Sequence, residues 1–170
     1  GFASSDRTIT MADAEPIRAT AVATLGVFGR ILRMRPLLGR MYGGVQSEPG
    51  SAPVVVVSHD LWHQLGGGDP SFVGSRIELN GESHEVIGVM PPEFAYPRRA
   101  QMWVPFPFEA RWYEPSARGS LFITALLRVG EGTSPEQLQA QLDAQEDVWG
   151  EQLGWTGGAR GRELNPTPFV

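Results

Sequence analysis

The chain contains neither cysteine nor lysine, and these two absences exclude several classes of protein. A P-loop nucleotidase needs a lysine on the nucleotide phosphates, and Schiff-base chemistry needs a lysine amine. Thiol catalysis, disulfides, iron–sulfur clusters and cysteine-based zinc sites all need cysteine. The chain is therefore not itself a P-loop ATPase.

The sequence also lacks any run of 18 or more apolar residues, the length typical of a membrane-spanning helix. Its N-terminus lacks the charged and apolar regions of a signal peptide. With 170 residues, 41% of them hydrophobic, it is long enough for one domain, or two small lobes, with a sizeable core. We therefore expect a folded protein that is either cytosolic or a piece of something larger.

All 14 basic residues are arginines, and charge is unevenly distributed along the chain. Residues 1–128 hold 12 arginines and 12 acidic residues, whereas residues 129–170 hold two arginines and seven acidic residues. The net charge of -5 therefore resides in the last quarter of the chain. A pI of about 5.2 argues against general nucleic-acid binding, so we expect no nucleic-acid partner.

Short β-prone runs bounded by turn residues predict most of the regular structure. They cover residues 7–11, 17–23, 54–57, 76–79, 82–89, 102–104 and 121–129, and residues 1–6 are expected to form a loose end. Asn80-Gly81 is the strongest signal for a two-residue hairpin turn in the chain. The register of that hairpin places four side chains on one face, those of Ile77, Leu79, His84 and Val86.

Helical spacing predicts two or three helices. They cover residues 25–34 behind a Thr24 cap, 59–65 behind a Ser58 cap, and 135–149 behind a capping box of Ser134 and Gln137. Because these helices do not alternate regularly with the strands, the pattern predicts an α+β fold of short antiparallel hairpins. A division into two lobes is left open. One would be a β-rich lobe over 54–106. The other would combine an N-terminal hairpin of residues 7–11 and 17–23 with the 25–34 helix, strand 121–129 and helix 135–149.

The sharpest candidate for catalysis is the segment His59-Asp60-Leu61-Trp62-His63. Two histidines one helical turn apart, with an acid between them, resemble the zinc-peptidase pattern H-E-x-x-H. The acid is aspartate, however, and the third ligand has no clear candidate beyond His84. The favoured interpretation is a surface helix whose Leu61 and Trp62 pack inward, so we expect no metal, cofactor or catalytic residue.

Two groups of residues are candidates for contact with a partner. An arginine cluster between residues 30 and 40 is suited to an acidic partner or anionic head groups, and its alternative is a solvated face. Exposed aromatic residues in a proline-flanked loop are typical of interaction sites, and their alternative is packing onto the core. The candidates are Arg30, Arg33, Arg35 and Arg40 in the first group, and Trp112 and Tyr113 in the second.

Four segments in consistent order resemble the MacB-type periplasmic core domain of FtsX-like ABC transporter permeases. They are RILRMRPLLGRMY (30–42), PVVVVSHDLWHQLGGGDPSFVGSRIELNGESHEVIGVMPPEFAYP (53–97), MWVPF (102–106) and RGSLFITALLRVGEGTSPEQLQAQL (118–142). The chain departs from the family pattern at Arg33, where the family has glycine, and at His84, where it has an aromatic residue. Gly66 replaces a phenylalanine, and Glu131 stands where lysine or arginine is common.

The resemblance implies a non-catalytic domain on the periplasmic side of the bacterial cytoplasmic membrane, inserted between the first two membrane helices of a permease. Its expected partners are the membrane part of the same permease, a second permease copy, a cytoplasmic ATPase domain or subunit, and a periplasmic adaptor. The implied function is to couple ATP-driven movement to export or efflux. Because the family's domain begins further upstream, residues 1–170 are expected to be a fragment or a shortened version.

Two alternative functions stay open at this point. One is a free-standing extracytoplasmic module that binds a ligand or an adaptor. The other is a zinc hydrolase that uses His59 and His63.

Overall fold

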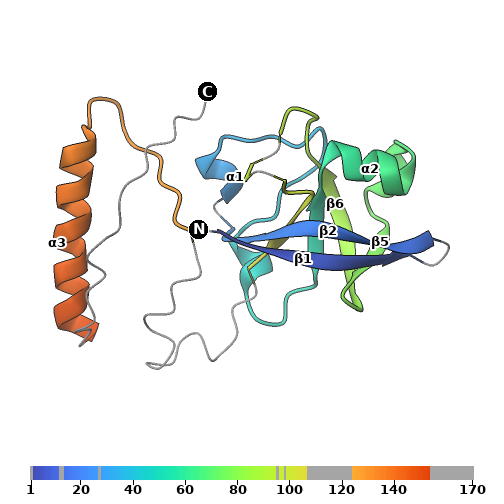
Figure 1. Cartoon of the computed structure of the whole chain (residues 1–170), viewed down its shortest axis with the longest axis horizontal. Helices are drawn as coiled ribbons and strands as arrows, with labels where there is room; N and C mark the ends of the chain where they lie inside the picture. Colours follow the sequence, from blue (N-terminus) through green and yellow to red (C-terminus); the bar gives the residue numbers. More distant parts are fainter. Residues whose placement is uncertain are drawn as a thin grey trace. The chain divides into compact units, whose positions relative to one another are not determined.

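The computed structural model describes residues 2–11, 14–26, 28–94, 96–97, 99–106 and 124–153 (Figure 1). It divides into two compact units, Gly1–Leu126 and Leu127–Val170, which are described separately. The strands of the first unit are β1 (Phe2–Met11), β2 (Ala14–Thr24), β3 (Leu38–Gly39), β4 (Val54–Val57), β5 (Arg76–Leu79), β6 (Glu82–Val89) and β7 (Met102–Pro105). Its helices are α1 (Phe28–Ile31) and α2 (His59–Gly66), with short 3-10 helices η1 (Gly44–Ser47) and η2 (Pro70–Phe72).

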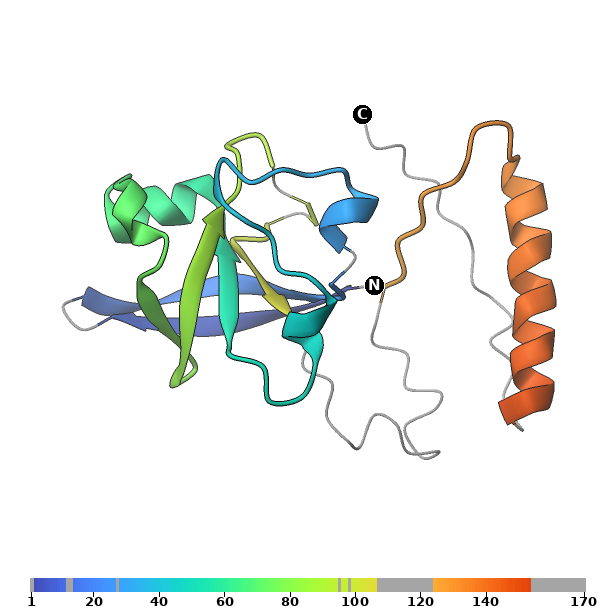
Figure 2. The same ribbon diagram turned by 180° about the vertical axis from the view of Figure 1, so that it is seen from behind.

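Six of these strands close into a barrel, in the order β6-β4-β7-β2-β1-β5, because β5 also pairs with β6 (Figures 1 and 2). The two predicted hairpins, β1–β2 and β5–β6, are confirmed. The sequence does not predict the parallel pairs β2–β7 and β4–β6, because each joins strands that are distant along the chain. The two-residue strand β3 pairs antiparallel with the last two residues of β6, Gly88 and Val89.

The Asn80-Gly81 turn has the register predicted from the sequence. Leu79 lies opposite Glu82 and Ile77 opposite His84. Both turn residues have positive φ, 53° at Asn80 and 83° at Gly81, as a type I′ turn requires. The Asn80 side chain also accepts a hydrogen bond of 2.9 Å from the Thr8 backbone, and this bond ties the turn to β1.

The barrel interior is filled by alternate residues of all six strands, as expected when every second side chain points inward. The shared cluster contains Ile9, Ala19, Ala21, Ala23, Val55, Val57, Ile77, Leu79, Val86, Val89, Met102 and Val104. Leu61 and Trp62 of α2 and Phe72 of η2 pack into the same cluster. As predicted, Ser58 caps α2 by accepting a hydrogen bond from Leu61, and Gly67 ends the helix in a left-handed conformation.

The outward side chains of β2, β4 and β7 are covered by a second layer. Val22, Val54, Val56 and Trp103 pack there with Phe28 of α1, Tyr42, Met90 and Ala100. Val54–Val57 is therefore buried on both faces, which confirms the fully buried strand predicted from its four valines.

A buried hydroxyl joins this second layer to the barrel. The Tyr42 hydroxyl donates to the Val104 carbonyl at 3.0 Å, so the Thr24 hydroxyl must be the donor in its short hydrogen bond with Tyr42. Burial raises the pKa of Tyr42 above its ordinary value, and the hydrogen bond from Thr24 acts in the opposite direction with a smaller effect. Tyr42 therefore stays neutral in the folded chain.

Three predictions from the sequence are wrong in part. Residues 2–6 are not a loose end, because they extend β1 and pair with residues 20–24. The helix expected over 25–34 is only the four residues of α1, because Thr24 stays in β2 and Arg33 adopts a left-handed conformation with φ of 53°. Of the strand expected over 121–129, residues 121–123 lie outside the described residues. Thr124 forms a single bridge to Phe2, and residues 125–129 form no strand.

The N-terminal hairpin belongs to the same sheet as the strands of 54–106, because β2 pairs with β7. It is therefore not grouped with residues 135–149, which lie in the second unit. The α+β class is confirmed, with three α-helices and one sheet in the residues that the structure describes.

The second unit contains α3 (Pro135–Leu153). The predicted capping box is present: Ser134 accepts from the Gln137 backbone at 3.2 Å, and Gln137 accepts from the Ser134 backbone at 3.0 Å. Leu138 and Leu142 of the predicted apolar stripe are half-buried. Within the described ranges, no helix combines the length and the apolar character needed to span a membrane.

Gly39 and Gly50 provide a matched test of how closely β3 approaches β6. Both have positive φ, 69° and 83°, so alanine at either position incurs left-handed strain of about 1–2 kcal/mol. A Cβ at Gly39 would also lie 2.2 Å from the Ile87 carbonyl oxygen, whereas a Cβ at Gly50 meets nothing within 4 Å. We therefore expect Gly39→Ala to lower the free energy of unfolding in urea clearly more than Gly50→Ala; equal losses would contradict the close approach.

The raised pKa of Tyr42 predicts a loss of stability at alkaline pH. The unfolded chain ionises its tyrosines near pH 10, whereas folded Tyr42 keeps its proton. The contribution of neutral Tyr42 to the free energy of unfolding is therefore complete below pH 10 and falls as the pH rises above 10. Urea unfolding below and above pH 10 measures how steeply the free energy of unfolding falls with pH. Tyr42→Phe should make this fall less steep. Partial burial also raises the pKa of Tyr96, so part of the fall remains in the variant.

At neutral pH, Tyr42→Phe removes two buried hydrogen bonds. The variant leaves the Val104 carbonyl and the Thr24 hydroxyl without this partner, so we expect it to cost about 1–3 kcal/mol. If the free energy of unfolding of this variant falls above pH 10 as steeply as that of the unmodified chain, the buried phenol is not the source of the fall.

Candidate functional site

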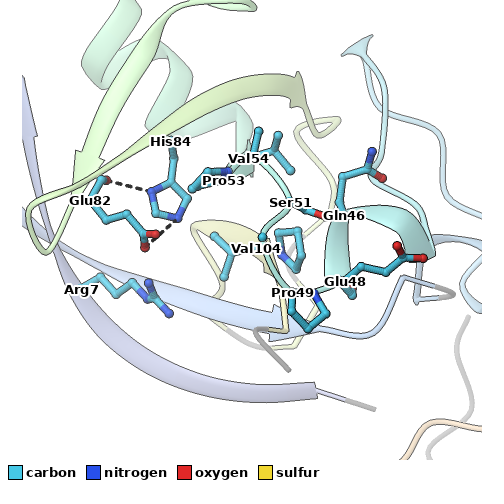
Figure 3. Close-up of a pocket in the computed structure, with 14 residues that line it drawn as sticks. Arg7, Gln46, Glu48, Pro49, Ser51, Pro53, Val54, Glu82, His84 and Val104 are labelled. Atoms are coloured by element: carbon cyan, nitrogen blue, oxygen red, sulfur yellow. Dashed lines mark hydrogen bonds and ion pairs between the residues drawn. The ribbon is translucent and has the colours of Figure 1, made fainter. Parts of the chain in front are cut away.

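One cavity lies at the end of the barrel where β4 and β6 begin and β7 ends (Figure 3). Its volume is about 530 Å³. Figure 3 shows Arg7, Glu82 and His84 on one side and the loop residues Gln46, Glu48, Pro49 and Ser51 on the other. The α2 helix starts just beyond the last residue of β4, so it lies at the opposite end of that strand from the cavity.

His84 is the buried polar residue of this cavity, with 5% of its surface exposed. Its Nδ1 lies 2.9 Å from the Glu82 carbonyl oxygen, and its Nε2 lies 3.7 Å from the Glu82 carboxylate. Because the carbonyl can only accept, this contact assigns the proton to Nδ1 in the neutral ring. The Glu82 carbonyl therefore orients the imidazole through Nδ1, and Arg7 lines the same side of the cavity.

The second cavity contains three of the four arginines singled out from the sequence. Its volume is about 420 Å³, and its lining consists of Arg30, Arg33, Arg35, Met34, Met41, Tyr42, Gly26 and Gly29. All four arginines are exposed, and Arg40, the fourth, does not line this cavity. Trp112 and Tyr113 lie outside the described residues, so their role stays a prediction.

Local backbone geometry brings these arginines together. Arg30 is in the last turn of α1, Arg33 follows it in the left-handed conformation, and the Met34 amide donates to the Gly29 carbonyl at 2.9 Å. Gly26 lies so close to the Gly43–Gly44 backbone that a Cβ would come within 2.5 Å of it. The segment that carries the arginines is thereby fixed against the segment that contains Tyr42.

The two histidines of the zinc-peptidase pattern do lie side by side on α2, with a distance of 4.5 Å between ring centroids. His84, the third ligand considered, is held by Glu82 inside the barrel. Among the described residues, no group of three histidine, aspartate or glutamate side chains is placed to hold a metal ion. Trp62 packs inward, as the favoured interpretation of this helix expects.

The sequence indicates only part of these two sites. Alternation in the β5–β6 hairpin places His84 on the inward face, which the structure confirms. Arg7 and the loop residues 46–53 carry no local signal for a shared cavity, because closure of the barrel brings them together. The arginine cavity does have a signal, because residues 17–40 contain five arginines and no acid.

The fold is shared with two solved domains of bacterial proteins. The periplasmic region of MacB from Actinobacillus actinomycetemcomitans superposes with a TM-score of 0.59 at 11% identity, over 90% of this chain and 65% of that one. A domain of a permease protein from Porphyromonas gingivalis superposes with a TM-score of 0.56 at 18% identity, over 86% of this chain and 62% of that one. The extracellular domain of the noncanonic ABC-type transporter YknZ from Gram-positive bacteria has a TM-score of 0.49 at 19% identity, over 62% of this chain and 52% of that one.

The chain thus spans between 52% and 65% of the length of these solved structures. No match to a protein of curated function was found. The sequence does match the family described as MacB-like periplasmic core domain, over residues 3–145. Because this match extends over well more than half of the chain, the chain belongs to the family of MacB-like periplasmic core domains.

Proposed function

We propose that this chain is the extracytoplasmic core domain of an ABC transporter permease and that it has no catalytic role. The family match over residues 3–145 is the observation that carries the proposal. In this role the domain lies on the outer side of the cytoplasmic membrane and is joined covalently to the membrane part of the permease. It couples ATP-driven movement of the permease to export or efflux.

The barrel supports a role in transmitting movement. Its interior and its outer layer are both close-packed, and β4 is buried between them on both faces. Such interiors have low compressibility and transmit strain. The first unit is therefore suited to move as one body when a force acts on one end of it.

The partners proposed for this role follow from the family. They are the membrane part of the same permease, a second permease copy in a dimer, and a cytoplasmic ATPase domain or subunit that acts at a distance. A periplasmic adaptor, the transported substrate or the twin domain would contact the domain directly.

One observation favours a second candidate, a free-standing module that binds a ligand. The barrel-end cavity has a volume of about 530 Å³, and small-molecule sites commonly measure about 300–1,000 Å³. The reading frame that encodes the chain separates the two candidates. Membrane spans on both sides of this segment support the permease domain, whereas an intact gene of this length with a signal peptide supports the free-standing module.

The proposed location predicts the outcome of cysteine labelling, for which a chain without native cysteine is well suited. Ser83 is exposed in the β5–β6 hairpin, so Ser83→Cys in the full-length protein should react with a membrane-impermeant maleimide in intact cells or spheroplasts. Mass-tagged maleimide on a denaturing gel measures the reaction.

Val56→Cys is the matched control, because Val56 is fully buried and should react only after denaturation. The unmodified full-length protein gives the background from any cysteines elsewhere in it. Labelling of Ser83→Cys that requires cell lysis would place the domain in the cytoplasm and end the proposal.

A further inference from the structure

We propose that the cavity lined by Arg30, Arg33 and Arg35 binds the phosphate group of an organic phosphate. Three arginines line this cavity, and none of the described residues that line it is acidic. Within the described part of the chain, no ion pair joins any of the three to an acidic side chain. The concentrated positive charge is therefore available to an anion from solution.

Guanidinium groups suit phosphate better than they suit a simple halide ion. Each presents a planar set of donors that matches two phosphate oxygens, and the resulting charge-assisted hydrogen bonds are about twice as strong as neutral ones. A phosphate offers acceptors in several directions, so it can contact more than one arginine at once. The cavity volume of about 420 Å³ far exceeds the roughly 30 Å³ that one water molecule occupies, so there is room for more than an inorganic ion.

The conformation of Arg33 is an independent reason to assign a ligand here. A bulky residue with positive φ is uncommon, and such strain costs of order 1–3 kcal/mol and concentrates at ligand sites. Arg33 has a φ of 53°, a conformation that glycine would adopt without strain. The chain therefore maintains an arginine where the backbone favours a glycine, and this residue lines the cavity together with Arg30 and Arg35.

The rest of the lining indicates the organic part of the ligand. Met34 and Met41 add flexible, polarisable apolar side chains beside the arginines, and the Tyr42 hydroxyl is already committed to Thr24 and Val104. The lining thus combines cationic and apolar residues. A phospholipid head group with its glycerol, and a small soluble phosphate ester, share the chemistry that fits both kinds of residue.

The test is an NMR titration of the arginine side-chain N–H signals in the 170-residue chain. The probes are inorganic phosphate, glycerol phosphate and short-chain phosphatidylglycerol below its micelle concentration, each against chloride at equal ionic strength. We expect saturable shifts with the organic phosphates and none with chloride. Tighter binding of phosphatidylglycerol identifies a lipid head group as the source, and tighter binding of glycerol phosphate identifies a soluble ester; either supports the site.

Three variants separate a defined site from general positive charge. Arg30→Gln and Arg33→Gly should each weaken binding by roughly fivefold to tenfold, the effect of losing a charged hydrogen bond at an exposed site. Arg40→Gln is the matched control, because Arg40 lies in the same segment and outside the cavity; it should weaken binding by less than about twofold. Arg33→Gly also relieves the left-handed strain, so its melting temperature should not fall.

Two results would overturn the proposal. One is the absence of saturable binding by any of the three phosphates. The other is an equal loss of affinity in Arg40→Gln and Arg33→Gly, which would assign the effect to long-range charge. Both results concern the isolated chain and leave the location of the domain in a permease untouched.

Discussion

The two-sided pairing of β5 is the constraint on which the rest of the structure depends. This four-residue strand joins β6 through the Asn80-Gly81 turn and joins β1 through the pairs Ile9–Leu79 and Thr10–Glu78. Without the second contact the six strands would form an open sheet, and the alternating apolar residues would have no common interior. The barrel-end cavity depends on this closure, because residues from β1, β4, β6 and β7 line it together.

Local chemistry explains which parts of the fold the sequence could predict. The Asn80-Gly81 turn, the Ser58 cap and the Ser134–Gln137 capping box each depend on residues within a few positions of one another, and all three appear as expected. The parallel pairing of β2 with β7 joins residues about 80 positions apart. No turn residue or period marks such a contact, so the sequence indicates strands but not their partners.

The same distinction holds for the two candidate sites. The arginines between 30 and 35 are close in sequence, and the amino-acid sequence alone reveals their unbalanced charge. The helix expected to carry them is too long, because Thr24 is retained in β2 by its hydrogen bond with Tyr42. Three of the four arginines line one cavity, among them the left-handed Arg33 that follows α1, whereas Arg40 does not.

The all-arginine composition gives the second cavity a charge that acidity does not change. A guanidinium in a protein does not give up its proton, and none of the described residues in this lining is a histidine or a carboxylic acid. Buried Tyr42, the other ionisable group there, stays neutral because its pKa is raised. Across the pH range in which the fold persists, any variation in anion affinity would therefore originate in the protonation of the ligand itself.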